Sequence, residues 1–459
     1  MKKKKPAKKS HKTAKHMKPA RKVQQAETEE KNGKTVSIVL DHVTKIEGHA
    51  RLDIRFEGSQ AKLVRLDVFE GARYFEALAK GRSFADAPTI TSRICGICSQ
   101  AHTLASLQAV ENALKVKVSR QTEQLRNLLH LGSLIQSHAL HLYFLALPDY
   151  LGFGDAISMA SKYPGEVRRG LALKRVGNKI CEVVAGREIH SITAVVGGFS
   201  KLPEQQMLDE LRHDLLDAQQ HAMRTAALFS RLKVPKFERK TIYASLLPRK
   251  TGPYTLLKGS IIAGKTNFQP ERYEQFFKEQ VVQTSSSKHV TMKESPLMVG
   301  ALARLNNREL LSRNAKRALS SSKMKLPCSN PYMNNLCQSI ELVNFVDRCI
   351  EILDEVQVSD EEMPDIRPKA GHGVSIIEAP RGLLIHDCKT NSSGEIKDYN
   401  IIAPTTINLQ NIEQDILALL PALAGKPQAQ IVLELEKLIR AYDPCISCSA
   451  HFLKVNWLK

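Results

Sequence analysis

The sequence contains no hydrophobic run long enough to cross a membrane, which takes about 20 consecutive apolar residues. Its most apolar stretch, residues 140–147, contains His141 and ends at Pro148. A polar residue within the stretch and a proline at its end are typical of a helix buried in a protein core. We therefore predict that the chain has no membrane span.

Motifs for common redox cofactors are also missing. No Gly-x-Gly-x-x-Gly motif follows a predicted strand, although such a motif is typical of dinucleotide-binding folds. Apart from two Cys-x-x-Cys pairs, no cysteine cluster of the kind that holds an iron–sulfur centre is present. We therefore expect no NAD, flavin or iron–sulfur site in this chain. If the protein performs redox chemistry, its electrons must leave through another polypeptide.

The formal net charge of +20 is unevenly distributed. Residues 1–22 contain eleven Lys or Arg and no acidic residue, so they carry more than half of it. Because like charges repel, we predict that residues 1–35 form a disordered basic tail. A tail that binds RNA, DNA or an acidic partner is the alternative, and nucleic-acid binding is the less favoured of the two.

Cysteine usage indicates a reducing compartment. The tail has neither the apolar segment of a secretory signal nor the Arg/Ser pattern of a transit peptide. Nine cysteines without such a signal are typical of proteins in which cysteines serve metals or catalysis, so we expect a cytoplasmic protein. The five cysteines outside the two pairs are predicted to be buried apolar residues, and they are Cys181, Cys328, Cys337, Cys349 and Cys388.

Hydrophobic periodicity predicts a mostly helical α+β protein. Alternating apolar residues predict a β-hairpin within residues 36–70. Helical spacing occurs over residues 100–115, 120–147, 168–186, 203–232, 332–356 and 428–441. Strands are predicted at 241–247, 255–263 and over 372–405, and a surface loop at 319–326. No linker interrupts the pattern, so residues 36–451 are expected to form one unit.

The two Cys-x-x-Cys pairs, Cys95/Cys98 and Cys445/Cys448, stand near opposite ends of the chain. Four thiolates could hold zinc, nickel, iron or an iron–sulfur cluster. A helix is predicted to follow Cys98, and a helix N-terminus favours the thiolate form of cysteine. His102 lies four residues further on and could donate a hydrogen bond to a ligating sulfur. A structural zinc site would account for the cysteines, but not for their separation or for His451.

These motifs resemble those of the large, catalytic subunit of nickel–iron hydrogenases, Arg-x-Cys-Gly-x-Cys and Asp-Pro-Cys-x-x-Cys-x-x-His. The resemblance extends over most of the chain, and further motifs occur in the family's order at residues 45–52, 71–76, 137–149, 186–199, 378–382 and 401–408. It implies an α+β, mostly helical fold with a central helical bundle and peripheral β pieces. Residues 330–342 are similar to the soluble multi-subunit type, nearest to the sulfhydrogenase or NADP-reducing alpha subunits.

The resemblance also implies a nickel–iron site in which the iron carries cyanide and carbon monoxide. Cys95 and Cys445 would be terminal nickel ligands, and Cys98 and Cys448 would bridge to iron. Cys445 would accept the proton released from H2, and Glu47 would relay it. An ion pair of Glu47 with Lys45 or Arg51 is the alternative interpretation.

Further roles follow from the same resemblance. Arg381 and Thr405 would donate hydrogen bonds to the cyanides, and Asp149 would orient Arg381. Glu76, the carbonyl of Ile401 and His451 would hold magnesium. For His138, His141 and His190, structural and proton-path roles remain equally open.

The family likeness implies partners as well. We expect an iron–sulfur small subunit and electron-transfer subunits that carry flavin, NADP(H) and iron–sulfur sites. We also expect a maturation endopeptidase that removes residues 452–459 after His451. The alternatives are a hydrogenase-like subunit of a respiratory complex, which would not need the four cysteines, and a zinc-binding protein associated with nucleic acid.

Overall fold

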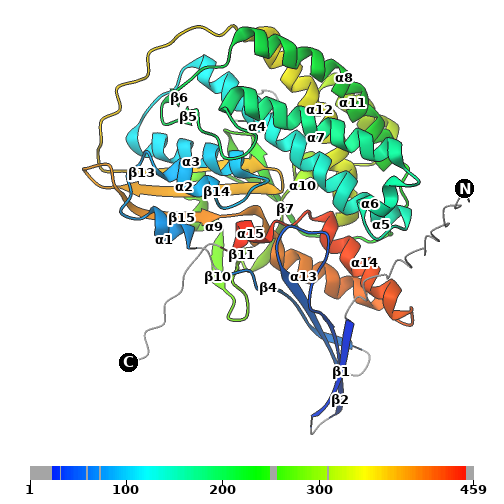
Figure 1. Cartoon of the computed structure of the whole chain (residues 1–459). Helices are drawn as coiled ribbons and strands as arrows, with labels where there is room; N and C mark the ends of the chain where they lie inside the picture. The colour runs from blue at the N-terminus through cyan, green and yellow to red at the C-terminus, as the bar shows by residue number, and fades with distance from the viewer. Residues whose placement is uncertain are drawn as a thin grey trace, which may run out of the picture.

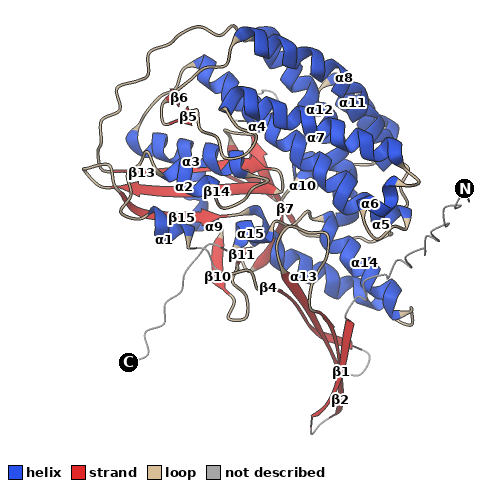
Figure 2. Ribbon diagram, in the orientation of Figure 1, coloured by secondary structure: helices blue, strands red, loops and turns tan. Residues whose placement is uncertain are grey.

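The structure, a computed structural model, describes residues 23–30, 33–57, 60–71, 74–248, 256–307 and 310–450, and for residues 23–30 and 33–36 it describes the backbone alone. Helices gather on one side of the molecule and the sheets lie beside and below them in the view of Figures 1 and 2. Among the described residues, no helix combines the length and the apolar character needed to cross a membrane.

Four long helices form a bundle. α4 packs against α7 and α12, and α8 packs against the same two helices. Glycines let α4 and α7 approach closely, because a Cβ atom on Gly177 would lie 2.6 Å from the backbone oxygen of Gly132. The periodicity predicted all four helices, which span Arg120–Leu140 (α4), Pro164–Ala185 (α7), Gln205–Phe229 (α8) and Asn334–Glu355 (α12). α4 continues into the π-helix η1 (His141–Ala146) and then α5 (Leu147–Leu151).

A three-stranded antiparallel sheet lies next to helix α3 (Ser99–Leu114). Its strands are β13 (Gly371–Ala379), β14 (Gly382–Thr390) and β15 (Ile396–Ile402). Gly373 lets α3 lie directly on β13, since a Cβ atom there would be 2.2 Å from the carbonyl oxygen of Ala109. Ala379 pairs with Gly382, so Pro380 and Arg381 form the two-residue tip of the β13–β14 hairpin.

Three further sheets complete the β structure. The first has the order β1-β2-β3-β4, the second β10-β11-β12-β7-β8-β9, and the third pairs β5 with β6. Their bounds are Val23–Glu30 (β1), Gly33–Leu40 (β2), Ala50–Glu57 (β3), Gln60–Val68 (β4), Ala194–Val195 (β5), Gly198–Phe199 (β6), Ile242–Leu247 (β7), Ser260–Ala263 (β8), Thr266–Phe268 (β9), Lys278–Val281 (β10), Lys288–Met292 (β11) and Ser295–Met298 (β12). The hairpin predicted within residues 36–70 is β3–β4.

The other helices are mostly short and connect these layers. They are Phe75–Ala79 (α1), Ala87–Ser92 (α2), Ala156–Ala160 (α6), Pro270–Arg272 (η2), Tyr273–Phe276 (α9), Ala301–Asn306 (α10), Arg313–Ser322 (α11), Pro331–Met333 (η3), Pro404–Leu423 (α13), Gln428–Ala441 (α14) and Ile446–Ser449 (α15). One large hydrophobic cluster joins the helical bundle to the region of α3, α13 and α14, and all four paired cysteines belong to it.

Several local predictions were wrong. The loop predicted at residues 319–326 begins inside helix α11, and the predicted strand region up to residue 405 runs into helix α13. Part of the predicted tail is also a strand, because Val23–Glu30 pairs with β2. Of the five unpaired cysteines, Cys328 is only half-buried, while the other four are buried as predicted.

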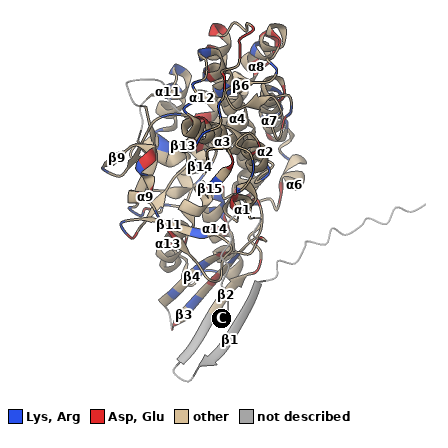
Figure 3. Cartoon of the chain, turned by 90° about the vertical axis from the view of Figure 1, so that its left-hand side faces the viewer, with Lys and Arg blue, Asp and Glu red and all other residues tan. Residues whose placement is uncertain are grey.

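Charged residues of both signs occur around the helices in the view of Figure 3, and Lys and Arg mark strands β3 and β4. One of these charges pairs with two buried carboxylates, because Arg65 contacts both Asp53 and Asp67. The eleven basic side chains of residues 1–22 lie outside the described residues.

Candidate metal centre

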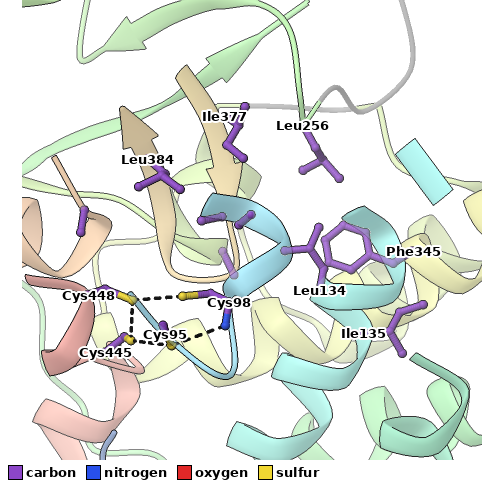
Figure 4. Close-up of a cluster of buried hydrophobic side chains, with 14 of the residues drawn as sticks. Cys95, Cys98, Leu134, Ile135, Leu256, Phe345, Ile377, Leu384, Cys445 and Cys448 are labelled. Carbon is purple, nitrogen blue, oxygen red and sulfur yellow. Dashed lines mark hydrogen bonds between the residues drawn. The ribbon is translucent and has the colours of Figure 1, made fainter. Parts of the chain in front are cut away.

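Four buried cysteine thiols meet at one point of the structure (Figure 4). The Sγ–Sγ distances are 3.5 Å for Cys95–Cys445 and 3.0 Å for Cys98–Cys448, and each of these pairs is 350 positions apart in the chain. Cys445 and Cys448 are 2.7 Å apart, and all four sulfur atoms lie within 4.8 Å of one another. Thiolates bind metals at about 2.3 Å, so this spacing suits ligands gathered on one compact centre.

The first pair is held by the start of helix α3. A helix follows Cys98, as predicted, and Cys98 is its N-cap residue. The backbone N–H groups of Ile97 and Cys98 point at the sulfur of Cys95, at 3.3 and 3.5 Å. Such N–H donors and the helix N-terminus favour a thiolate. Gly96 has no positive φ and open space around its Cα, so the turn does not require glycine.

The second pair is held by the loop that contains Glu47. Asp443 has a left-handed backbone (φ 52°) and turns the chain into Pro444 and Cys445. Cys445 then forms a parallel bridge with Glu47, and the N–H of Ile446 donates to the Glu47 carbonyl at 2.9 Å. These backbone contacts fix the C-terminal cysteines to a segment almost 400 residues earlier in the chain.

The carboxylate of Glu47 is hydrogen-bonded to the sulfur of Cys445. Its Oε2 accepts hydrogen bonds from the Cys445 thiol at 3.1 Å and from the N–H of Ser447 at 3.0 Å. The alternative ion pairs are not formed, because Lys45 pairs with Asp149 and Arg51 approaches Asp41. The predicted neighbour of the cysteines is therefore in hydrogen-bond contact with one of them.

Arg381, at the tip of the β13–β14 hairpin, is held beside the cysteines by Asp443. Its Nε donates to the Asp443 carbonyl at 2.9 Å and its Nη2 to the Asp443 carboxylate at 3.1 Å. Although burial opposes the charge, Asp443 and the nearby cysteines raise the pKa of the guanidinium above its usual value. Its Nη1 is buried and has no hydrogen-bond partner among the described residues. A buried donor of this kind fits an additional acceptor at the site.

The prediction that Asp149 orients Arg381 was wrong. The Asp149 carboxylate binds two other cations, Lys45 and Arg440. Asp443 takes the predicted role because it stands two residues before Cys445 and its left-handed backbone turns it toward the hairpin tip. The Asp-Pro sequence that precedes Cys445 is the signal that points to Asp443.

The other predicted site residues lie near the cysteines or close to one another. The hydroxyl of Thr405, at the start of α13, accepts the N–H of Cys445 at 2.9 Å, which fixes it beside that cysteine. The Oε1 of Glu76 accepts the N–H of Ile401 at 3.0 Å, so two of the three predicted magnesium ligands are neighbours. The third, His451, lies outside the described residues.

The histidines have polar partners within the fold. Nδ1 of His102 is 3.1 Å from Nε2 of His386, and its predicted hydrogen bond to a ligating sulfur stays a prediction. His138 contacts Glu341 at 2.8 Å, and His141 contacts Gln338 at 2.6 Å. Nδ1 of the half-buried His190 is 3.0 Å from the carbonyl of Ser92, close to the first cysteine pair. These contacts favour structural roles for His138 and His141.

Comparison with known proteins assigns the family. The family model of nickel-dependent hydrogenases matches residues 73–169 and 277–451, which is more than half of the chain and includes the four cysteines. The chain belongs to this family of hydrogenases. It is therefore an oxidoreductase that acts on H2, of the catalytic large-subunit type. The predicted α+β, mostly helical fold is confirmed.

Individual relatives agree with this hydrogenase assignment. The alpha subunits of sulfhydrogenases 1 and 2 from Pyrococcus furiosus are both 36% identical to this chain, over 91% of its length and over 98% and 100% of theirs. Among solved structures, an NAD+-reducing NiFe hydrogenase in its H2-reduced state superposes with a TM-score of 0.83. That chain is 26% identical, and the match covers 90% of this chain and 99% of the other.

The electrostatics of the hydrogenase site also fit a bound metal. Hydrogen bonds from Cys445, Cys448 and Cys98 lower the pKa of the Cys95 thiol well below its usual value. Burial instead raises the pKa of Cys445 and Cys448 well above it. The cluster therefore favours one thiolate and opposes further negative charge, an opposition that a metal cation removes. The soft four-thiolate donor set and the family together support a nickel–iron active site.

One segment of the hydrogenase chain matches a phosphate-binding sequence pattern but does not have the corresponding structure. Residues 259–266 match Gly-x4-Gly-Lys-Thr, the pattern of a phosphate-binding loop. In the structure, Ser260–Ala263 and Thr266–Phe268 are the paired strands β8 and β9, joined by a two-residue turn. A phosphate-binding loop connects a strand to a helix N-terminus. This segment is a β-hairpin, so the match has no such function.

Proposed function

We propose that this chain activates hydrogen in a cytoplasmic, multi-subunit hydrogenase that exchanges electrons between H2 and NADP(H) through partner subunits. The observation that carries the proposal is the contact of four buried cysteines with one another and of Cys445 with the Glu47 carboxylate. The sulfhydrogenase alpha subunits among the relatives support the multi-subunit type. The NAD+-reducing structure supports a soluble nicotinamide acceptor.

In this proposal the cysteines divide the metal ligation between them. Cys95 and Cys445 would bind nickel alone, and Cys98 and Cys448 would bind nickel and bridge to iron. Cys98 lies 3.0 Å and Cys445 lies 2.7 Å from Cys448, so these sulfurs are close enough to ligate one compact centre, and the division between them follows the family resemblance. When bound, the nickel–iron group supplies the electron-rich centre at which H2 is split heterolytically.

The proton from H2 would pass from Cys445 to Glu47. The donor–acceptor distance of 3.1 Å is within hydrogen-bond reach, which is the geometric requirement for a proton acceptor. The N–H of Ser447 and the parallel bridge hold the carboxylate and its backbone in place. Glu47 is only partly buried, so it lies between the cysteine cluster and the surface of this chain.

Arg381 and Thr405 would receive the cyanide ligands of the iron. The unpartnered Nη1 of Arg381 is a charged donor, and charge-assisted hydrogen bonds to an anion are stronger than neutral ones. The Oγ1 of Thr405 accepts from Cys445, which leaves its own hydrogen to donate. Two donors beside the cysteine cluster suit an iron that carries anionic diatomic ligands.

A magnesium ion would be held by Glu76, the carbonyl of Ile401 and His451. Carboxylate and carbonyl oxygens are the ligands that magnesium prefers. The contact between Glu76 and the backbone of Ile401 supports a shared site. Lys288 lies 4.0 Å from the same carboxylate oxygen of Glu76, so this cation would have to yield to the metal.

Electrons and maturation would involve other proteins. An iron–sulfur small subunit would take electrons from the site, and subunits with flavin, iron–sulfur and NADP(H) sites would complete the transfer. An endopeptidase would remove residues 452–459 once the metals are in place.

Co-purification of the native complex tests the proposal. We expect an iron–sulfur small subunit and a nicotinamide-binding subunit to accompany the chain, and the complex to reduce NADP+ with H2. A matched complex that carries Cys448→Ser should keep the partners and lose H2-dependent reduction. A native complex that reduces an artificial dye with H2 but neither NADP+ nor NAD+ would contradict the proposed acceptor.

A further inference from the structure

A second arginine, Arg304, binds the backbone of the hairpin tip that carries Arg381. We propose that Arg304 is a positioning residue that fixes the Arg381 loop and thereby aims the Arg381 guanidinium at the metal site. This inference rests on the proposed role of Arg381 toward the iron ligands.

Arg304 holds the backbone immediately before Arg381. It lies on the short helix α10 and is completely buried. Its Nη1 donates to the carbonyl of Ala379 at 3.2 Å, and its Nη2 donates to the carbonyl of Pro380 at 3.3 Å. One guanidinium therefore binds two consecutive carbonyls at the tip of the β13–β14 hairpin.

Two buried carboxylates orient the guanidinium of Arg304. Glu341 on α12 pairs with Nε and Nη2 of Arg304 at 2.5 and 2.7 Å. Glu378, which precedes Ala379 on β13, pairs with Nη1 at 3.1 Å. All three side chains have zero solvent exposure. The planar five-donor fork of arginine can serve two carboxylates and two carbonyls at once, whereas the compact ammonium of lysine cannot.

The same helix also contacts Arg381 itself. Gly300 is the N-cap of α10, with φ 114°, and a Cβ atom there would lie 3.1 Å from the carbonyl oxygen of Arg381. Helix α10 therefore touches residues 379, 380 and 381 in succession. The glycine permits this close approach, and the arginine one turn later secures it.

Backbone and side chain of Arg381 are thus held by different parts of the chain. α10 fixes the backbone, and Asp443, two residues before Cys445, holds Nε and Nη2. A shift of the hairpin tip relative to Asp443 would turn Nη1 away from its target. Displacements of about 1 Å at a reaction site can lower rates about 100-fold.

The test compares Arg304→Lys with Arg126→Lys in the holoenzyme. Arg126 is a matched control because it is also buried, pairs bidentately with Glu111 at 2.7 Å and donates to the carbonyl of Val195 at 3.0 Å. The measurements are nickel per chain, kcat and KM for H2 per nickel, and the infrared bands of the iron-bound cyanides. Arg381→Lys provides the reference for a displaced guanidinium.

We expect Arg304→Lys to lower kcat per nickel at least tenfold, with little change in KM, and to shift or broaden the cyanide bands as Arg381→Lys does. Arg126→Lys should retain wild-type kcat and bands even if its thermal midpoint falls. If Arg304→Lys matches Arg126→Lys in rate and bands while Arg381→Lys does not, the positioning role is wrong and the proposed function stands. If Arg381→Lys also leaves the bands and rate unchanged, the proposed role of Arg381 fails with it.

A variant that keeps Arg304 covers the case in which Arg304→Lys does not assemble. Glu341→Gln retains an acceptor oxygen but removes the charge that orients the fork, so it should shift the same bands and lower kcat less strongly. Unchanged cyanide bands and an unchanged kcat in a nickel-loaded Glu341→Gln enzyme would overturn the positioning role of Arg304.

Discussion

Replacement of Glu47 by glutamine tests the proton-transfer role of this residue while leaving the fold and the metal ligands in place. The structure gives the Glu47 Oε2 two hydrogen bonds, one from the Cys445 thiol and one from the N–H of Ser447. A glutamine amide oxygen has a similar size and can still accept from Ser447. An amide cannot take up a proton at neutral pH, so the relay is lost.

The expected magnitude follows from the chemistry that is removed. A positioned acid or base contributes roughly 10²- to 10⁴-fold to a rate, which corresponds to about 2.7–5.4 kcal/mol in the activation free energy. The stability cost should be about 1 kcal/mol, the value of one hydrogen bond. Turnover should therefore fall by orders of magnitude while the fold and the nickel content persist.

H2 oxidation with an artificial acceptor, normalised to nickel, measures the effect. Glu70→Gln is the matched control. The Glu70 carboxylate also accepts a backbone N–H near Glu47, that of His49 at 3.0 Å. Among the described residues, no hydrogen bond joins Glu70 to a cysteine. We expect Glu70→Gln to retain its rate. A Glu47→Gln enzyme with full nickel and wild-type turnover would refute the relay.

Four further results are expected. Cys445→Ser should abolish nickel retention, measured by elemental analysis, because a hard hydroxyl replaces a soft thiolate; normal nickel content would contradict its role as a ligand. Cys181→Ala should leave the rate per nickel unchanged and cost about 1 kcal/mol in denaturant unfolding, since this thiol is buried away from the cluster. Burial raises the pKa of Glu413 to about 7, above its unfolded value of about 4.3. The folded state therefore binds this proton more tightly than the unfolded state does. As the pH rises from about 4 to 7, the folded state loses up to roughly 3 kcal/mol of stability. Glu413→Gln, which keeps an acceptor for the N–H of Leu66, should therefore gain stability relative to wild type over that interval in urea titrations, and parallel curves would exclude this contribution. Intact-mass measurement of the nickel-loaded enzyme should show a chain that ends at His451, and retention of residues 452–459 would disprove the processing step.

The sequence predicted the long helices and the meeting of the two cysteine pairs. The helices over residues 120–147, 168–186, 203–232 and 332–356 were predictable because each buries one apolar face over many turns. The motifs that contain Cys95 and Cys445 predicted that distant segments meet, and the structure brings their sulfur atoms to 3.5 Å.

Other features depend on contacts that one sequence does not display. Asp443 binds Arg381 because its backbone adopts a left-handed turn, whereas Asp149 lies nearer to Lys45 and Arg440. The clamp by Arg304 was not predictable either, because a lone arginine in an apolar stretch gives no sign of its partners. The strand prediction up to residue 405 is wrong at its end because the strand-like sequence Ile-Ile-Ala precedes the first turn of helix α13.

The most direct test of the central claim is metal analysis of the purified chain combined with its infrared spectrum. We predict one nickel and one iron per chain, with cyanide and carbonyl bands that disappear in Cys448→Ser. A chain that contains zinc alone, or nickel without these bands in an active preparation, would contradict a nickel–iron site built from the four cysteines.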